Sequence, residues 1–464
     1  MKARAIFVSV GLALLGIVAT ACGGDGGGGP AETPEIGAAT PAAGPVAINF
    51  WHAMTAANED TLKRLTDEFN ASQDRITVTP LFQGTYEDNL NKVLASLGSG
   101  NVPAVAQLED SVTQMMVDSG AVVPAQDYID AEEYDLSDFL PQVLDYYRVD
   151  GRLVPMPFNV SNPVLFYNKI AFEKAGLDPE KPPATLDELK EYSQAIVDAG
   201  TAPHGLALDI KPWYLEHFLA KAGAEYANNG NGRDARATEV AFGGEEGLAI
   251  FTWWKDMVDS GLALNVGRNP SDSEQLFAIA GRQAEMAIGT SAALRSSIDV
   301  LESAHTAGEL LDIDLGVGPM PGLPGETGGV LVGGGALYVM ADRPPEEQQA
   351  AWEFIKFLVS AESQAKWFGG SGYIPSRVSS HDLPAAIDIV QQYPQFQVAV
   401  DQLAESPVTT ATAGALLGPF LECRNAVTSG IESMILQDRD PADALAEAAA
   451  EADAAIEKYN SRVQ

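Results

Sequence analysis

Short polar side chains precede an apolar run in the middle of the chain, and no other stretch looks more like part of a binding site. Residues 159–162 (NVSN) follow Pro155 and Pro157, whose rings hold the backbone extended. Residues 164–167 (VLFY) form a short apolar run that predicts a buried strand. Hydroxyl and amide groups at the mouth of a buried strand suit a ligand cleft. The alternative is a structural strand with a polar lead-in.

The sequence has none of the compact motifs that carry enzymatic chemistry. Its five histidines are scattered, without the short spacing of a zinc site. No G-x-S-x-G nucleophile elbow occurs, and the glycines at 333–335 are not followed by the lysine of a P-loop. Residues 316–318 (GVG) lack the third glycine of a dinucleotide site. We therefore expect a protein that is not an enzyme, with no catalytic residue, metal or cofactor.

The elements around this stretch alternate between strands and helices. The first part of the chain predicts strands at 47–54, 76–82 and 102–108, and helices at 58–72, 85–97 and 111–119. This alternation is typical of a parallel α/β sheet. Further helices are predicted at 170–176, 186–199 and 245–260, and strands at 285–289, 315–317 and 328–340. Beyond Pro345 the pattern is mostly helical.

The charge of the chain excludes one class of partner. The sequence holds 64 acidic and 28 basic residues, which gives a net charge of -36. A nucleic-acid-binding protein needs a basic face, so we expect no nucleic-acid partner. An anionic small ligand is still compatible, because surface charges are screened within roughly 8 Å and one buried arginine can dominate a pocket.

The first residues predict the compartment. A basic start is followed by the apolar run Ala5–Val18 and then by Ala-Thr-Ala-Cys, ending at Cys22. This resembles a bacterial lipobox, in which Cys22 is lipidated; an ordinary signal peptide or a buried helix is the alternative. We expect a lipoprotein signal peptide at 1–22, a flexible tether at 23–45 and an anchor on the outer face of the cell membrane. Cys423 would then be the remaining cysteine, buried and unreactive.

Ten stretches spread over the chain carry a family resemblance. They are FWHAM, QGTYEDNL, SLGSGNVPAV, FLPQVLDYY, the segment from Pro155 to Leu189, VGR, VGVGPMPG, GGGALYVM, WFGGSGYIPS and RNAV. The chain resembles the extracellular solute-binding proteins of ABC importers, of the sugar-binding family 1 type. Within that family it is most similar to the members that bind sn-glycerol 3-phosphate. The match runs from about Ile48 to about Tyr459, and 158–188 is its most specific part.

The resemblance implies a two-lobed α/β fold of the type II periplasmic-binding-protein kind, with strands that cross a hinge. Both lobes would be discontinuous in sequence. Lobe I would comprise residues 46–155 and 290–340, and lobe II would comprise residues 156–289 and 341–464.

The resemblance also implies which residues bind the phosphate end of a ligand. Arg424 would form bidentate hydrogen bonds from its guanidinium group to phosphate oxygens. Gly334 would let a backbone N–H approach the anion without a Cβ in the way. The hydroxyls of Ser161 and Thr290, with Ser291 adjacent, would bind the same group.

Other matched positions would bind the remainder of the ligand. Glu109 would hold glycerol hydroxyls, and Tyr86 and Tyr373 would pack on the carbon skeleton. Trp213, in the stretch 208–218 (LDIKPWYLEHF), would stack on a sugar or hold a choline group. The family has tryptophan where this chain has Leu186, which leaves the exact ligand open.

Several of these residues have structural alternatives. Tyr86 could lie at an exposed helix start, Glu109 could be a solvated acid, and Ser161 a turn residue. Tyr373 could belong to the core, and Arg424 could pair with Glu422 along one helix.

We interpret the chain as a monomeric, lipid-anchored substrate-binding protein that delivers sn-glycerol 3-phosphate or a glycerophosphodiester to an ABC permease. The rival ligand is a neutral di- or oligosaccharide. The rival classes are a secreted glycerophosphodiester hydrolase and a surface adhesion or scaffold protein.

Overall fold

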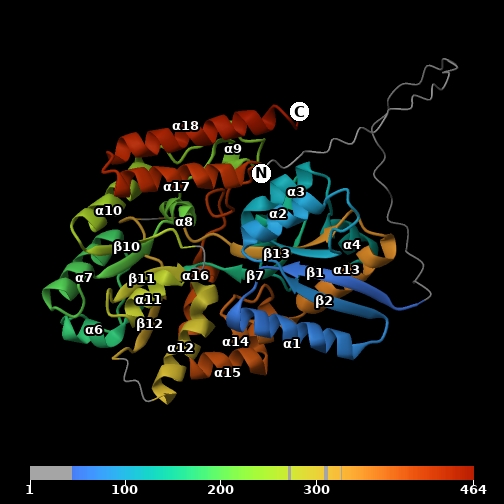
Figure 1. The fold of residues 1–464 in the computed structure, drawn as a ribbon, viewed down its shortest axis with the longest axis horizontal. Coiled ribbons are helices and arrows are strands. Elements are labelled where there is room, and N and C mark those ends of the chain that lie inside the picture. Colours follow the sequence, from blue (N-terminus) through green and yellow to red (C-terminus); the bar gives the residue numbers. More distant parts are fainter. Residues whose placement is uncertain (1–43, 270–272, 308–311, 326, 464) are drawn as a thin grey trace, which may run out of the picture. The chain divides into compact units, whose positions relative to one another are not determined.

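Two mixed β-sheets, each flanked by helices, organise the chain (Figure 1). The computed structural model describes residues 44–269, 273–307, 312–325 and 327–463. Cys22 and nearly all of the predicted signal peptide and tether lie outside the described residues. Within these residues no helix is long and apolar enough to cross a membrane.

The first sheet is parallel at one side and antiparallel at the other. Its strand order is β2 (Ile76–Phe82), β1 (Val46–His52), β3 (Val105–Glu109), β13 (Gly333–Met340) and β4 (Val122–Val123), and β7 (Met156–Ser161) also pairs with β13. The predicted parallel pairing is confirmed for β1 with β2 and β3. However, β13 runs antiparallel to β3, β4 and β7. This strand enters the first sheet after the chain has passed through the second one.

Helices with apolar faces cover this first sheet, and we call the sheet with its helices lobe I. They are α1 (Ala56–Ser72), α2 (Tyr86–Ser96), α3 (Thr113–Asp118), α4 (Ala125–Glu132), α5 (Pro141–Tyr146), α13 (Pro345–Leu358), α14 (Ala361–Ser371) and α15 (Pro384–Gln392). The predicted stripe of Leu62, Leu65 and Phe69 on α1 is buried. A capping box opens α2 at the start of the predicted helix 85–97, where Thr85 Oγ1 accepts from the N–H of Asp88 and the Asp88 carboxylate accepts in return.

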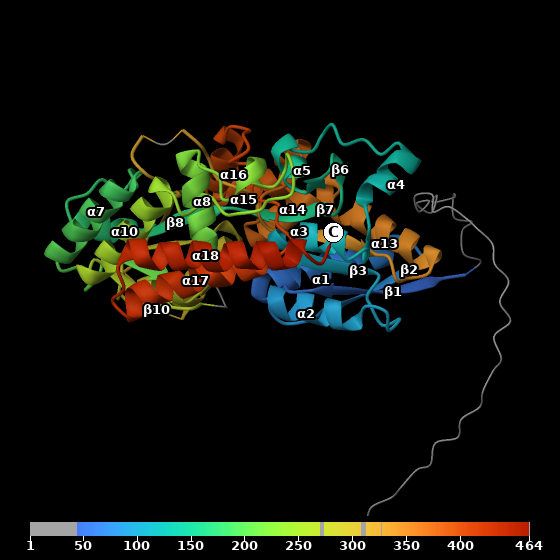
Figure 2. The ribbon, with the colours of Figure 1, turned by 90° about the horizontal axis from the view of Figure 1, so that it is seen from above.

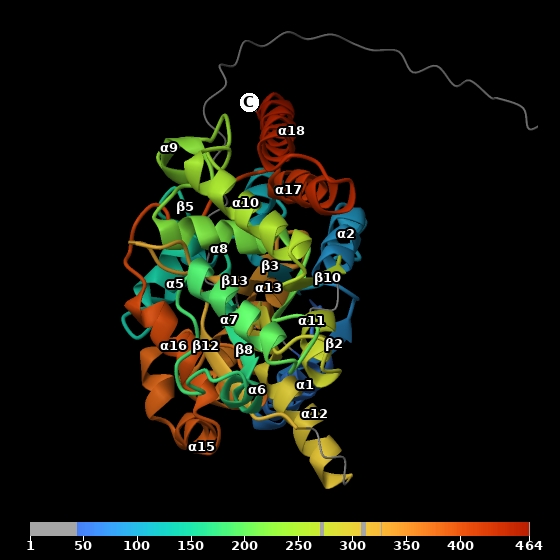
Figure 3. The ribbon, with the colours of Figure 1, turned by 90° about the vertical axis from the view of Figure 1, so that its left-hand side faces the viewer.

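The second sheet has the order β10 (Ala263–Gly267), β9 (Leu206–Asp209), β11 (Met286–Thr290), β8 (Pro163–Asn168) and β12 (Leu315–Pro319). We call this sheet and its helices lobe II, which Figure 3 views from the side of α6 and α7. The helices are α6 (Lys169–Lys174), α7 (Leu186–Asp198), α8 (Pro212–Ala222), α9 (Asn228–Asn231), α10 (Glu245–Asp259), α11 (Glu274–Ala280), α17 (Phe420–Leu436) and α18 (Pro441–Asn460). The last two lie side by side (Figures 1 and 2).

The chain crosses between the sheets several times. It passes from β7 to β8 at Asn162, and from β11 through η2 (Ser291–Ala293) into α12 (Leu294–Thr306), which packs on α1 and α14. It returns through β12 and crosses again into β13. The remaining elements are η1 (Asp110–Val112), β5 (Arg148–Val149), β6 (Arg152–Leu153), η3 (Val378–Asp382) and α16 (Gln395–Glu405).

These crossings place three segments differently from the predicted lobe boundaries. Residues 156–161 (β7) lie in the first sheet, although we expected them in lobe II. Residues 315–319 (β12) lie in the second sheet, although we expected them in lobe I. Residues 345–371 pack on β1, β13 and α1, so this part of the predicted lobe II also belongs with the first sheet. Hinge-crossing strands pair with distant segments, and local periodicity does not reveal those partners.

Candidate ligand-binding site

Arg424, on α17, is buried among carboxylates from both lobes. Its Nε donates to Oε1 of Glu216 at 2.7 Å, and its Nη2 donates to Oε2 of Glu216 at 2.9 Å and to Oδ1 of Asp110 at 3.1 Å. Its Nη1 lies 3.0 Å from Oε2 of Glu109. Glu216 is on α8 of lobe II. Glu109 is the last residue of β3 in lobe I, and Asp110 is the first residue of η1, which follows it. We call these four residues the Arg424 cluster.

In this arrangement Arg424 is paired with carboxylates, and its expected contact with a phosphate stays a prediction. The edge of the guanidinium group expected to grip a phosphate already holds the Glu216 carboxylate with two hydrogen bonds. Arginine has five N–H donors, and the cluster engages four of them. The carboxylates that bind Arg424 come from β3, η1 and α8, and not from Glu422, the alternative partner on its own helix.

Burial changes the protonation of the acidic groups. Only 5 % of Asp110 and 3 % of Glu216 is exposed. Burial raises the pKa of Asp110 to about 7, against the opposing effect of the Arg424 charge. Burial likewise raises the pKa of Glu216. Asp110 and Glu216 therefore take up protons more readily than exposed carboxyl groups do.

Tyr86, Tyr373 and Asn159 form the next part of the site. The side-chain amide of Asn159 is hydrogen-bonded to Tyr86 Oη at 2.7 Å, and Tyr86 Oη lies 3.5 Å from Tyr373 Oη. Burial raises the pKa of Tyr86 well above its ordinary value, with a smaller contribution from the charge of Glu109. Tyr373 stacks on Trp367, with ring centroids 5.4 Å apart. Both tyrosine side chains are therefore fixed by their neighbours, and their two hydroxyl groups lie next to each other.

Hydroxyl groups gather where the strands cross between the lobes. The N–H of Asn162 donates to Ser291 Oγ at 3.4 Å, and the N–H of Ser291 donates to the Asn162 carbonyl at 3.0 Å. Thr290 Oγ1 accepts from the N–H of Ala292 at 3.3 Å. The Ser161 hydroxyl, in a residue that is 3 % exposed, bonds to no other described residue. Since Thr290 and Ser291 accept these bonds, their O–H groups are available to donate to a ligand.

Two glycines of β13 allow close packing at this crossing. Gly334 has φ +99°, and a Cβ there would lie 2.0 Å from the Asn159 carbonyl oxygen. A Cβ at Gly333 would lie 2.6 Å from Cζ2 of Trp213, so the indole ring packs directly on the strand. Gly333 is also paired with Ser161 across the sheet. The predicted residues Trp213, Gly334 and Ser161 therefore meet at one edge of β13.

Trp213 is held at the start of α8. Its ring packs edge-on against His217 at 4.4 Å, and Lys211 Nζ lies 4.9 Å from the ring centroid. Leu186 is buried in the core of lobe II. The Nε1–H of Trp253 donates to the Leu186 carbonyl at 3.2 Å. Leu186 thus replaces a family tryptophan at a position that is filled by core packing here.

Sequence reasoning missed Asp110 and Glu216, whereas Asn159 belongs to the polar stretch 159–162 that it singled out. The signal for Glu216 was its position three residues after Trp213, which puts both on one face of a helix. Asp110 directly follows the predicted Glu109, and Asn159 opens the polar stretch before Ser161. Cys423 was correctly predicted as buried, and burial raises the pKa of its thiol to about 12, which makes it a poor nucleophile.

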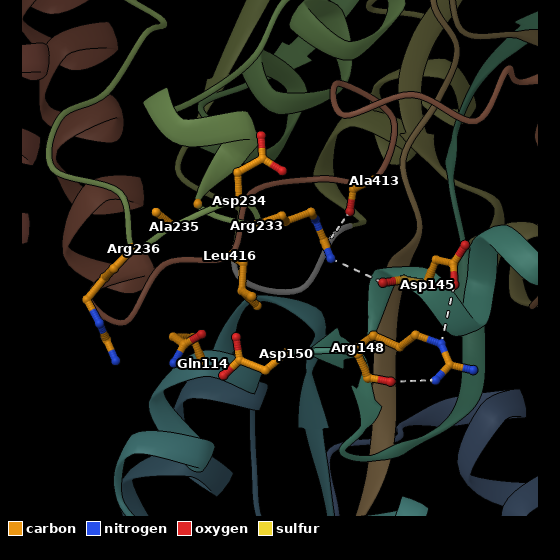
Figure 4. A pocket seen from close by; sticks show the side chains of 12 residues that line it. Gln114, Asp145, Arg148, Asp150, Arg233, Asp234, Ala235, Arg236, Ala413 and Leu416 are labelled. Atoms are coloured by element: carbon orange, nitrogen blue, oxygen red, sulfur yellow. Dashed lines mark hydrogen bonds and ion pairs between the residues drawn. The ribbon is translucent and has the colours of Figure 1, made fainter.

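A pocket of about 360 Å³ is lined by other residues than those described above (Figure 4). Arg233 of lobe II reaches across it, and its guanidinium donates to the carbonyls of Asp145, Tyr146 and Gly414 at 2.8–3.1 Å. Nearby, Arg236 binds both oxygens of Asp118 on α3, at 2.8 Å each. The two arginines therefore join lobe II to lobe I outside the predicted site.

The comparisons with known proteins agree with this architecture. Residues 64–398 match the family described as bacterial extracellular solute-binding protein. The chain is 31% identical over 417 residues to the sn-glycerol-3-phosphate-binding periplasmic protein UgpB of Rhizobium meliloti (strain 1021), covering 88% of this chain and 93% of that protein. It is 31% identical over 422 residues to UgpB of Pectobacterium atrosepticum, covering 89% and 90%.

Solved structures show the same fold. UgpB from Mycobacterium tuberculosis in complex with glycerophosphocholine superposes with a TM-score of 0.75 at 20% identity, over 90% of this chain and 100% of that one. The GacH receptor of Streptomyces glaucescens superposes with a TM-score of 0.73 at 21% identity, over 89% and 99%. The fold is therefore that of two-lobed solute-binding proteins. The chain belongs to the bacterial extracellular solute-binding protein family.

Proposed function

We propose that this protein captures sn-glycerol 3-phosphate or a glycerophosphodiester between its lobes and delivers it to the permease of an ABC importer. One observation carries the proposal: positions expected to bind the ligand, far apart in sequence, come together at one interface. Tyr86 contacts Tyr373, and Ser161 lies opposite Gly333, beside Gly334, within lobe I, while Glu109 of lobe I contacts Arg424 of lobe II. The similarity to UgpB over nearly the whole length of both chains supports the ligand class.

Binding would act on the equilibrium between open and closed lobes. A ligand that touches both lobes binds the closed form more tightly and shifts the population toward it. The Arg424 cluster supplies groups from both lobes, as this mechanism requires. No bond of the ligand is made or broken, and the monomeric closed protein docks on the permease.

A neutral di- or oligosaccharide is the second candidate ligand. The observation that favours it is the occupied guanidinium of Arg424, because the paired carboxylates offset its charge toward an anion and can themselves accept from sugar hydroxyls. Trp213 would then provide the stacking surface for a sugar ring.

A thermal-shift panel tests both candidates. The purified protein is heated with glycerol 3-phosphate, glycerophosphocholine, maltose or trehalose. A ligand at a hundred times its dissociation constant adds roughly 2.7 kcal/mol to the free energy of unfolding, which moves the melting curve clearly. Stabilisation by the phosphate esters alone supports the proposal. Stabilisation by the disaccharides alone would overturn the ligand class and leave the family unchanged.

We also propose that Cys22 carries a lipid that anchors the protein outside the cytoplasm. The Ala-Thr-Ala-Cys sequence supports this assignment. Mass spectrometry of the membrane-extracted protein should show an acylated N-terminal cysteine at position 22. Release of a Cys22→Ala variant into the medium would agree with it, whereas an unmodified Cys22 in the mature chain would contradict it.

A further inference from the structure

The Arg424 cluster has more negative than positive charge. Three carboxylates surround one guanidinium group, so the fully ionised cluster carries two excess negative charges. Lys211, at the start of α8, lies near enough to lower the pKa of Glu216, and including it still leaves one excess negative charge. If Asp110 holds a proton, the four residues of the cluster still carry one excess negative charge. These residues thus offer an anion no surplus positive charge.

The strand crossing between the lobes provides neutral donors. The hydroxyls of Ser161, Thr290 and Ser291 lie there and can donate O–H groups to an oxyanion. Neutral donors add no positive charge that would offset a second negative charge. A site built from these donors and the Arg424 cluster therefore suits a ligand that carries hydroxyls and a singly charged phosphate.

We propose that Asp110 and Glu216 make this site selective for phosphodiesters over phosphomonoesters. The proposal rests on the proposed function, because it assumes that the ligand is a glycerol phosphate ester. A monoester carries about 1.5 to 2 negative charges at pH 7, because its second pKa is near 6, whereas a diester carries one. In a site of low dielectric constant that already has excess negative charge, the additional charge is repelled. We expect the affinity for a diester to exceed that for a monoester by about tenfold at pH 7.5.

Selectivity should depend on pH, because several groups that titrate or carry charge face one another here. They are Glu109 and Asp110 after β3, Lys211, Glu216 and His217 on α8, Tyr146 and Tyr147 at the end of α5, and Arg424 on α17. Burial lowers the pKa of His217 well below its ordinary value, so this ring is neutral near pH 7. Acidification to pH 5.5 protonates the monoester and Asp110, so the preference for the diester should shrink.

Calorimetry with three ligands separates charge from other causes. Glycerol 3-phosphate is the monoester, glycerophosphoglycerol is a diester without a cation, and glycerophosphocholine is a diester with one. We expect both diesters to bind about tenfold more tightly than the monoester at pH 7.5, with a smaller ratio at pH 5.5. Asp110→Asn and Glu216→Gln should each reduce the ratio. Asp67→Asn, which removes an exposed charge on α1, is the matched control and should leave the ratio unchanged.

Three results would overturn the inference. The first is a monoester that binds as tightly as glycerophosphoglycerol at pH 7.5. The second is a preference for glycerophosphocholine alone, which would assign selectivity to the choline cation. The third is a ratio unchanged in both variants, each shown to be folded by its melting curve; if neither folds, the ratio at the two pH values in the unaltered protein decides. Binding of a disaccharide and of no phosphate ester would instead overturn the proposed function itself.

Discussion

Arg424 and Glu216 form a two-pronged ion pair, in which Nε and Nη2 of the arginine donate to the two carboxylate oxygens at 2.7 and 2.9 Å. The pair is buried and fixes the guanidinium plane. The remaining edge of the arginine is directed to Asp110 and Glu109 in the other lobe. Glu216 therefore fixes the orientation in which the Arg424 guanidinium contacts Glu109 and Asp110 of lobe I.

Replacing Arg424 by methionine should destabilise the fold, because Asp110 and Glu216 would be buried without a counter-charge. Removing one partner of a buried ion pair costs about 3–5 kcal/mol. The loss should be smaller at pH 5 than at pH 8, since the carboxyl groups can take up protons. Urea unfolding at the two pH values measures it.

The control for Arg424→Met is Arg268→Met. Arg268 is largely exposed and pairs with Glu432 at 2.6 Å, so its loss should cost less than about 1 kcal/mol. If the substitution lowers the free energy of unfolding by the same amount at pH 5 and at pH 8, relative to the unaltered protein, the assignment of buried, ionised carboxylates would be contradicted.

Asp110 should make the folded state less stable as the pH rises through the range from about 4 to 7. Its pKa is about 7 in the folded protein and 3.8 as the ordinary value, so the folded state binds more protons in this window. The free energy of unfolding then falls with rising pH, by at most about 1.4 kcal/mol per pH unit. Urea titrations of the unaltered protein and of Asp110→Asn should diverge across this window. Parallel curves would show that Asp110 does not titrate there.

Gly333→Ala should weaken ligand binding without unfolding the protein. The new methyl group would lie 2.6 Å from Cζ2 of Trp213, so the indole ring must move from its place against β13. We expect a several-fold loss of affinity in calorimetry, because a displacement of about 1 Å in a binding group is costly. Gly44→Ala is the matched control, since no atom lies within 4 Å of a Cβ there. Unchanged affinity would place Trp213 outside the site.

The elements that the sequence predicted well are those determined by neighbouring residues. The helices predicted at 58–72 and 85–97 depend on an apolar stripe and on a Thr85 cap, which arise within one or two helical turns. Strand β7 was assigned to the wrong lobe because its partner, β13, follows more than 170 residues later. Pairing over such a distance leaves no local period in the sequence.

The site was predictable only in part, for the same reason. Family motifs identified single positions such as Tyr86 and Arg424, but not the residues that contact them. Glu216 and Asp110 lie 208 and 314 residues from Arg424 in sequence. An acidic residue on a helix is usually solvated, so neither carboxylate stood out among the 64 acidic residues of the chain.

Arg236→Ala should shift the lobes toward the open form. Arg236 of lobe II binds both oxygens of Asp118 in lobe I at 2.8 Å, and Tyr459 Oη donates to the same carboxylate at 3.0 Å. Because Arg236 is partly exposed, the pair contributes up to about 1 kcal/mol to the closed form. Loss of the pair should reduce ligand affinity by up to about fivefold and increase the radius of gyration in X-ray scattering without ligand. Asp118→Asn should reproduce both changes, and high salt should reduce the difference from the unaltered protein. An affinity that is insensitive to both substitutions would show that this ion pair persists in the open form as well.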